Sequence, residues 1–141
     1  MPSATRSLTI SANTASLHAA MEFVRGGALE ACLPEARLNE LDLLIEEIFM
    51  NVCRHAYPDG RQGVVILTYS APAPGEFRVE VADQGVEFNP LTAAPPDLTL
   101  DLKNWPIGGL GIFLVKALTA SATYRRDRDW NRLTFGISVG S

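Results

Sequence analysis

Apolar residues recur with a helical period through much of the first half of the chain. Over about residues 35–56 they follow the i, i+3, i+4, i+7 spacing of an amphipathic helix, at Leu41, Leu44, Ile45, Ile48, Val52 and Ala56. An earlier helix is expected to begin at Thr14 or Ser16 and to continue to about Leu33, where Pro34 stops it. We therefore expect two consecutive helices before residue 57.

Strand patterns occupy both ends of the chain and its middle. Residues 7–13 have β propensity, and residues 63–71 and 76–83 read as two strands joined by a Pro- and Gly-rich turn. Residues 108–120 open with glycines and become helical, and residues 121–139 read as a closing hairpin with its turn near residues 127–130. This order predicts an α/β (α+β) two-layer sandwich, with a mixed, mostly antiparallel sheet and helices on one face.

Length and composition narrow the class of protein. A chain of 141 residues fits a single domain with a sizeable core, so we expect one domain over residues 1–141. The net charge of −4 argues against a surface for nucleic acid or an anionic membrane. Without an apolar run near the ~20 residues of a membrane span, or a signal peptide, the chain is expected in the cytoplasm. Cys32 and Cys53 lack metal-site spacing, so we expect buried, reduced thiols.

One irregular stretch is too long for a simple connection. Residues 84–107 contain four prolines and no clear period. Structureless loops of this length in compact domains are usually functional or mobile, so we expect this one to serve a site.

Three polar residues line one stripe of the helix expected at residues 35–56. Glu47, Asn51 and His55 lie at i, i+4 and i+8. On a helical wheel Asn51 is roughly 80° and His55 roughly 40° from the centre of the apolar stripe, so both lie at the edge of the buried face. A half-buried amide without a partner costs ~1–3 kcal/mol. Either these side chains bond nearby backbone and do nothing else, or they face a site.

Two further motifs allow a structural and a functional interpretation. Asp83 ends a strand and Gly85 follows it, which is common turn chemistry, or else a carboxylate aimed into a pocket where a flat ring approaches the glycine. The segment IGGLGIFLVKAL (107–118) is either a tightly packed helix entry or a set of backbone N–H groups that bind an anion. It is neither a Walker A motif nor GxGxxG. Thr134 in NRLTF is by itself an ordinary strand threonine.

Together these motifs resemble a known family. E-x-x-x-N-x-x-x-H-A-Y, then D-x-G-x-x-F-x-P after a strand, then G-G-L-G before an apolar helix, then N-x-L-T, resembles the Bergerat-fold ATP-binding domain of the GHKL superfamily, which includes gyrase, histidine kinases and a heat-shock chaperone. NVCRHAYP, DQGVEFNP and GGLGIFLVKAL are similar in particular to anti-sigma-factor serine/threonine kinases of the RsbW/SpoIIAB type. The resemblance extends over about residues 8–139.

The resemblance implies ATP and Mg²⁺ as cofactors and a role for the helical row. Asn51 would hold Mg²⁺ through its side-chain oxygen, a donor that this hard cation prefers. Glu47, one turn earlier, would act as the general base for the attacking hydroxyl. His55 would lie near the same nucleotide face.

The resemblance also implies residues for the base and the phosphates. Asp83 would accept a hydrogen bond from the adenine 6-amino group, with Gly85 beside the ring and Thr134 supporting that contact directly or through water. Phe88 from the same motif would also belong to the nucleotide site. Backbone N–H groups would bind the phosphates at Gly109, Leu110 and Gly111. Residues 84–107 would form the ATP lid. One departure is Glu87, which stands where the family usually has the second glycine of D-x-G-x-G.

The function implied is a partner switch. The chain would phosphorylate a serine or threonine of a small STAS-type anti-sigma-factor antagonist, and would bind a sigma factor until unphosphorylated antagonist displaces it; the resemblance also implies a homodimer. Two alternatives stay open: a regulator that binds nucleotide without catalysis, and a detached histidine-kinase-like catalytic domain. The sequence lacks a phospho-acceptor histidine motif, which argues against a complete histidine kinase.

Overall fold

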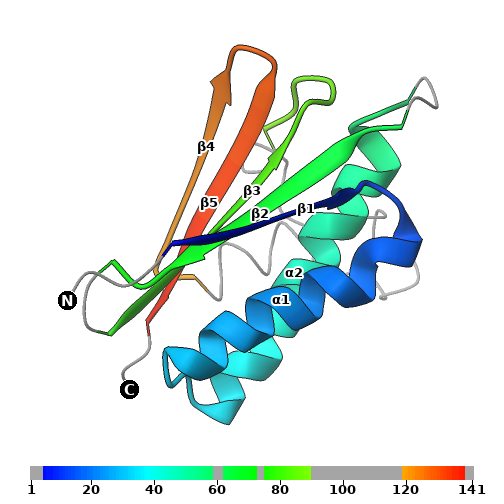
Figure 1. The fold of residues 1–141 in the computed structure, drawn as a ribbon. Helices are drawn as coiled ribbons and strands as arrows, with labels where there is room; N and C mark the ends of the chain where they lie inside the picture. The colour runs from blue at the N-terminus through cyan, green and yellow to red at the C-terminus, as the bar shows by residue number, and fades with distance from the viewer. Residues whose placement is uncertain (1–4, 59–61, 73–74, 90–118, 139–141) are drawn as a thin grey trace, which may run out of the picture.

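The computed structural model describes residues 5–58, 62–72, 75–89 and 119–138, and in them two helices cover one face of a five-stranded sheet (Figure 1). The strand order is β1-β2-β3-β5-β4, and each described pair of neighbours is antiparallel. This confirms the predicted two-layer α/β fold. The elements are β1 (Arg6–Ser11), a 3-10 turn η1 (Thr14–Ser16), α1 (Leu17–Glu30), α2 (Glu35–His55), β2 (Val64–Ser70), β3 (Glu76–Asp83), β4 (Ser121–Asp127) and β5 (Trp130–Ser138).

The core lies between the helices and the inner face of the sheet. Alternate residues of the central strands are buried against the helices, and each such apolar side chain contributes about 1.5–3 kcal/mol when fully buried. They are Val65, Leu67 and Tyr69 of β2, Phe77, Val79 and Val81 of β3, and Leu133, Phe135 and Ile137 of β5. The same alternation, continued to the strand ends, buries Asp83 and Asn131 as well. The strand alternation therefore places the polar side chains of Asp83 and Asn131 on the inner face of the sheet.

Helix α1 ends earlier than the sequence suggested. It was expected to continue to about residue 33 and to stop at Pro34, but its last helical residue is Glu30. Cys32 adopts a left-handed conformation with φ 64°, its N–H donates to Leu29 O (3.0 Å), and Leu33 N–H donates to Ala28 O (3.1 Å). These two bonds form a Schellman motif, which closes the helix before the proline is reached.

Some details at the element ends differ from expectation. The first strand stops at Ser11, two residues before the predicted end. Ser16 precedes α1 but its side chain makes no capping bond. Cys32 is exposed and Cys53 half-buried, so the prediction of two buried thiols is wrong for Cys32. None of the described helices is long and apolar enough to span a membrane.

The C-terminal end of α2 is fixed to the sheet by three hydrogen bonds. The Tyr57 hydroxyl donates to Val64 O at 2.8 Å and accepts from Gln84 N–H at 2.9 Å. Val86 N–H donates to Ala56 O at 2.8 Å. Because these bonds join α2 to the start of β2 and to the loop after β3, the last turns of α2 lie beside the end of β3.

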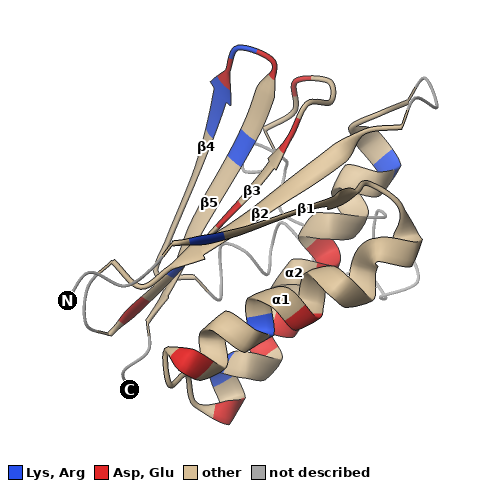
Figure 2. Cartoon of the chain, in the orientation of Figure 1, with Lys and Arg blue, Asp and Glu red and all other residues tan. Residues whose placement is uncertain are grey.

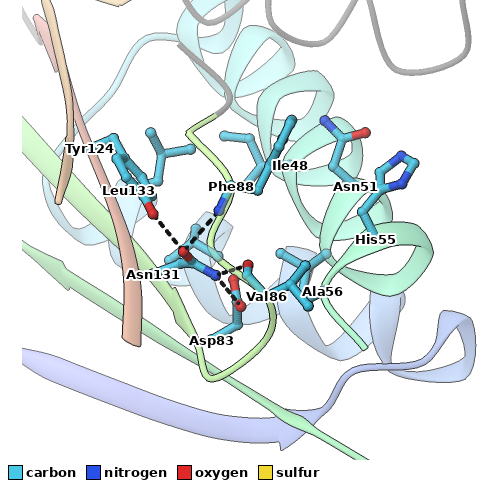
Figure 3. A pocket seen from close by; sticks show the side chains of 12 residues that line it. Ile48, Asn51, His55, Ala56, Asp83, Val86, Phe88, Tyr124, Asn131 and Leu133 are labelled. Carbon is cyan, nitrogen blue, oxygen red and sulfur yellow. Dashed lines mark hydrogen bonds between the residues drawn. The ribbon is translucent and has the colours of Figure 1, made fainter. Parts of the chain in front are cut away.

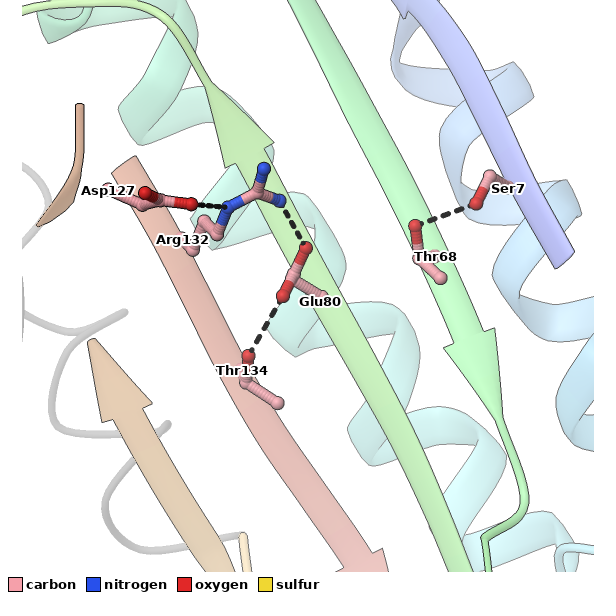
Figure 4. A network of polar contacts seen from close by, with 6 residues as sticks. All are labelled: Ser7, Thr68, Glu80, Asp127, Arg132 and Thr134. Atoms are coloured by element: carbon pink, nitrogen blue, oxygen red, sulfur yellow. Dashed lines mark hydrogen bonds and ion pairs between the residues drawn. The ribbon is translucent and has the colours of Figure 1, made fainter. Parts of the chain in front are cut away.

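Charged residues are unevenly placed over the described elements. Figure 2 shows acidic residues mainly along α1 and α2, and arginines on β4 and the turn that follows it. On β5 and β3, Arg132 pairs with Glu80 at 2.9 Å, and Arg132 Nε lies 3.5 Å from Asp127 (Figure 4). Ser7 and Thr68 share a hydrogen bond of 2.8 Å between β1 and β2. These contacts link polar side chains of neighbouring strands, although the buried Arg132 Nε has no hydrogen bond to any described residue.

Candidate functional site

A pocket lies between the C-terminal half of α2, the loop after β3, and strands β4 and β5 (Figure 3). The space among its lining side chains, counted together with the open solvent at its mouth, is about 530 Å³. Most of the lining is apolar, from Ile48, Val52, Ala56, Val81, Val86, Phe88 and Leu133, and the polar lining residues are Asn51, His55, Asp83, Tyr124 and Asn131. An apolar pocket with a few convergent polar groups is the usual form of a small-molecule site.

Asp83 places a buried carboxylate in this pocket. The residue is 6% exposed, and its Oδ1 accepts from Gly85 N–H at 2.8 Å and from Asn131 Nδ2 at 2.9 Å. The other oxygen, Oδ2, accepts no hydrogen bond from any described residue. Burial raises the pKa of Asp83, while the hydrogen bonds from Asn131 and Gly85 and the charge of Arg126 act in the opposite direction. Asp83 therefore has one oxygen held by the protein and one available to a ligand's amino group.

Asn131 is the centre of the polar network, and sequence reasoning missed it. The side chain is 6% exposed, and its Nδ2 donates to Asp83 Oδ1 and, at 2.8 Å, to Val86 O. Its Oδ1 accepts from the Tyr124 hydroxyl at 2.6 Å and from Phe88 N–H at 3.3 Å (Figure 3). One buried amide thus joins β5, β4, the end of β3 and the loop after it.

The structure places Thr134 outside the pocket, although it was predicted to support the base contact. Cross-strand register pairs Asp83 with Asn131 and places Thr134 opposite Glu80. The Thr134 hydroxyl lies 3.5 Å from a Glu80 carboxylate oxygen, on the side of β5 that faces away from the pocket (Figure 4). The strand period could have shown this, because Leu133 and Thr134 must point to opposite faces. Asn131, on the buried face of the same strand, lines the pocket and donates to Asp83.

The helical row reaches the pocket in part. Asn51 is half-buried and lines the pocket, and its side chain makes no hydrogen bond to any described residue. His55 is exposed, and its ring centroid lies 6.3 Å from that of Phe88. Glu47 is half-buried one turn before Asn51 and is not among the lining residues. The structure therefore brings Asn51, His55 and Phe88 to the site and leaves Glu47 beyond its edge.

Gly85 has a different reason to be glycine from the one expected. A Cβ at this position would lie 2.2 Å from Ala56 O and 2.4 Å from Ala56 Cβ, and the residue does not line the pocket. Its missing side chain therefore allows the loop after β3 to contact the end of α2. On the other side, Gly85 O accepts from Arg126 Nη1 at 2.8 Å, and the same nitrogen lies 3.2 Å from Asn131 Oδ1.

Of the remaining residues singled out in the sequence, one is exposed and the others lie outside the described part of the chain. Glu87, the departure from the family motif, is exposed and does not line the pocket. The phosphate-binding positions Gly109, Leu110 and Gly111 and most of the predicted lid, residues 90–107, lie outside the described residues.

Comparison of the sequence with known protein families identifies the class of protein to which this fold and pocket belong. The family model described as a histidine kinase-like ATPase domain matches residues 10–137, and the chain belongs to that family. The resemblance to GHKL ATPases is therefore confirmed.

The chain also resembles individual proteins. The serine/threonine-protein kinase BtrW of Bordetella bronchiseptica is 30% identical over 94 residues, which cover 67% of this chain and 66% of that protein. The structure of the RsbU and RsbW domains of Rv1364c from Mycobacterium tuberculosis matches 96% of this chain with a TM-score of 0.68 and 15% identity, which shows a shared fold. The blue-light activated histidine kinase of Erythrobacter litoralis EL346 matches 76% with a TM-score of 0.56 and 25% identity. This chain covers 32% of either solved chain.

Proposed function

We propose that this chain is an ATP-dependent serine/threonine-protein kinase of the anti-sigma-factor type. It phosphorylates a small STAS-type antagonist and holds a sigma factor until unphosphorylated antagonist displaces it. The observation that carries the proposal is the buried Asp83 carboxylate in an apolar pocket, whose α2 side carries the Asn51 amide, a group without a hydrogen bond to any described residue. The similarity to BtrW, a serine/threonine kinase by name, supports the choice of acceptor.

Adenine suits the buried end of the pocket. Its ring would lie among the apolar lining residues, and its 6-amino group would donate to Asp83 Oδ2, the oxygen to which no described residue donates. A polar group that pairs with a buried acceptor contributes to affinity and to specificity, because a wrong base leaves the acceptor unsatisfied.

The α2 side of the pocket suits the phosphates and their cation. The Asn51 amide is a neutral oxygen donor with no competing hydrogen bond among the described residues, which fits Mg²⁺, a cation that takes its other ligands from phosphates and water. When bound, Mg²⁺ supplies charge neutralisation for the triphosphate. Asn51 would orient the polyphosphate end, while Asp83 orients the base.

Glu47 would accept the proton of the attacking hydroxyl. It lies one helical turn, about 6 Å along the axis, before Asn51 and outside the pocket lining, where a substrate side chain could approach. As the substrate oxygen bonds to the γ-phosphorus, its proton passes to the Glu47 carboxylate and the bond from that phosphorus to ADP breaks.

Replacement of Glu47 tests the kinase proposal. We expect Glu47→Gln to lower phosphoryl transfer to a STAS-type antagonist by about 10²–10⁴-fold, because the amide cannot accept the proton, while nucleotide affinity stays unchanged. Transfer is measured with γ-³²P-labelled ATP, and Glu46→Gln, an exposed neighbour on the same helix, is the matched control.

Three other outcomes would change the proposal. Transfer by Glu47→Gln at the wild-type rate would contradict the role of Glu47. Wild-type protein that binds nucleotide but phosphorylates no antagonist would favour the non-catalytic regulator. An acid-labile phosphate on the partner would favour the histidine-kinase-like alternative over phosphoserine.

A further inference from the structure

The neighbours of Asn131 determine the orientation of its side-chain amide. Phe88 N–H can only donate, and it points to Oδ1, while Val86 C=O can only accept, and it receives Nδ2. A flipped amide would place donor against donor and acceptor against acceptor, in a buried site where each unsatisfied group is costly. Asn131 therefore presents an N–H, not an oxygen, to Asp83.

This orientation determines what Asp83 offers to a ligand. Both hydrogens of Asn131 Nδ2 are used, one on Asp83 Oδ1 and one on Val86 O. Gly85 N–H also binds Oδ1, so Oδ2 of this pocket-lining residue is an acceptor to which no described residue donates. The buried end of the pocket thus holds an available acceptor, and no amide hydrogen of Asn131 is left for a ligand carbonyl.

We propose that Asn131 is the positioning residue that sets the nucleobase preference of the site. It holds Asp83 so that a purine with a 6-amino group is bound and a purine with a 6-oxo group is rejected, since the 6-oxo carbonyl would face a carboxylate oxygen. This proposal rests on the proposed nucleotide-binding function. It assigns base selection to Asn131, which bonds Asp83 Oδ1 and not Oδ2, the oxygen proposed to recognise the base.

The hydrogen bonds around Asn131 favour a positioning role for this residue over a role in packing alone. Tyr124 and Arg126 from β4 converge on Asn131 Oδ1 with the backbone of Phe88. Asn131 also bonds Val86 and Phe88 in the loop after β3. These bonds fix the Asp83 carboxylate relative to the apolar side chains that line the pocket.

The test compares Mg²⁺–ATP with Mg²⁺–inosine triphosphate, which carries a 6-oxo group in place of the 6-amino group. Dissociation constants are measured by calorimetry for the wild type, Asn131→Leu and Thr134→Val. We expect the wild type to prefer ATP by about tenfold or more, and Asn131→Leu to reduce the preference to within about threefold, mainly through weaker ATP binding. Thr134→Val, a nearly isosteric change on the outer face of the same strand, should keep the wild-type ratio.

Asn131→Asp gives a second readout that packing alone would not produce. The new carboxyl can donate to Asp83 only while it is protonated, so ATP affinity should fall about tenfold between roughly pH 6 and pH 8, whereas the wild-type affinity stays nearly constant. The other titratable or charged groups around Asp83 are His55 from α2, Tyr124 and Arg126 from β4, and Glu87 from the loop. All four are present in the wild type, whose profile therefore corrects for them.

The outcomes separate the two proposals. If Asn131→Leu fails to fold, the pH profile of the nearly isosteric Asn131→Asp decides, with circular dichroism as the check on folding. Folded variants that keep the wild-type preference for ATP and its pH profile would overturn the role of Asn131 and leave nucleotide binding intact. A wild type that binds neither nucleotide would overturn the proposed function, and this inference with it.

Discussion

At the scale of single residues, the site depends on the Asp83 carboxylate. Burial raises its pKa, and its hydrogen-bond donors lower it. Desolvation disfavours the ionised form of Asp83, and the donors Asn131 and Gly85 recover part of that cost. A raised pKa means that the folded state binds the proton more tightly than the unfolded state does. The stability that this contributes is present below the ordinary pKa of 3.8 and is lost as the pH rises through the raised value.

Asp83→Asn should separate stability from binding. The amide can keep Oδ1 as acceptor for both donors while it removes the buried charge. We expect the free energy of unfolding of the wild type to fall relative to Asp83→Asn as the pH rises from about 4 to about 7, and ATP affinity to be lost. Urea unfolding at several pH values measures this difference. Asp129→Asn, an exposed acid in the turn after β4, should show no such trend, and a pH-independent difference for Asp83→Asn would contradict the expectation.

At the scale of elements, helix ends and strand faces decide which residues meet. Helix α2 carries Asn51 and His55 to the pocket because its last turns are tied to the strands through Ala56 and Tyr57. Helix α1 turns into α2 through the left-handed Cys32, a position at which glycine is the usual residue. The left-handed backbone of Cys32 therefore makes an unfavourable local contribution to the free energy of folding.

Cys32→Gly should stabilise the domain. A side chain at φ 64° costs roughly 1 kcal/mol relative to glycine, and Cys32 is exposed, so little packing is lost. We expect the free energy of unfolding to rise by about 0.5–1 kcal/mol, seen as a higher urea midpoint with an unchanged slope. Cys32→Ala retains the Cβ and should leave the midpoint nearly unchanged. Equal gains for both variants would point to the thiol and not to the backbone.

At the scale of the whole molecule, the pocket lies where the helical layer meets one end of the sheet, so a ligand contacts both layers. Residues from α2, β3, β4 and β5 line it together. A ligand held between layers binds only the folded chain, and its binding energy therefore adds to the stability of the entire domain.

Mg²⁺–ATP should raise the unfolding temperature of the domain. At about 100 times its dissociation constant it would add about 2.7 kcal/mol, a shift of several degrees for a domain of this size. Asn51→Ala should lose the Mg²⁺-dependent part of the shift. Asn39→Ala, an exposed asparagine on the same helix, should keep it. The absence of any shift at millimolar nucleotide would show that the pocket does not bind ATP.

The amino-acid pattern was sufficient to predict the periodic elements and the residues that share a face within each of them. Helix α2, the strand that ends at Asp83 and the final hairpin were all predictable, because side-chain direction follows from the helical and strand repeats alone. The motif order was enough to identify the superfamily, and the helical row of Asn51 and His55 was found from its spacing.

Which side chains complete the site depends on how the elements pack together. Asn131 meets Asp83 across 48 positions of sequence, through a strand register that no local pattern states. The same register places Thr134 on the other face, and the contact of Gly85 with Ala56 depends on how α2 docks on the sheet. Periodicity sets the direction of a side chain within one element, whereas pairing between elements depends on the energy of the whole packed core.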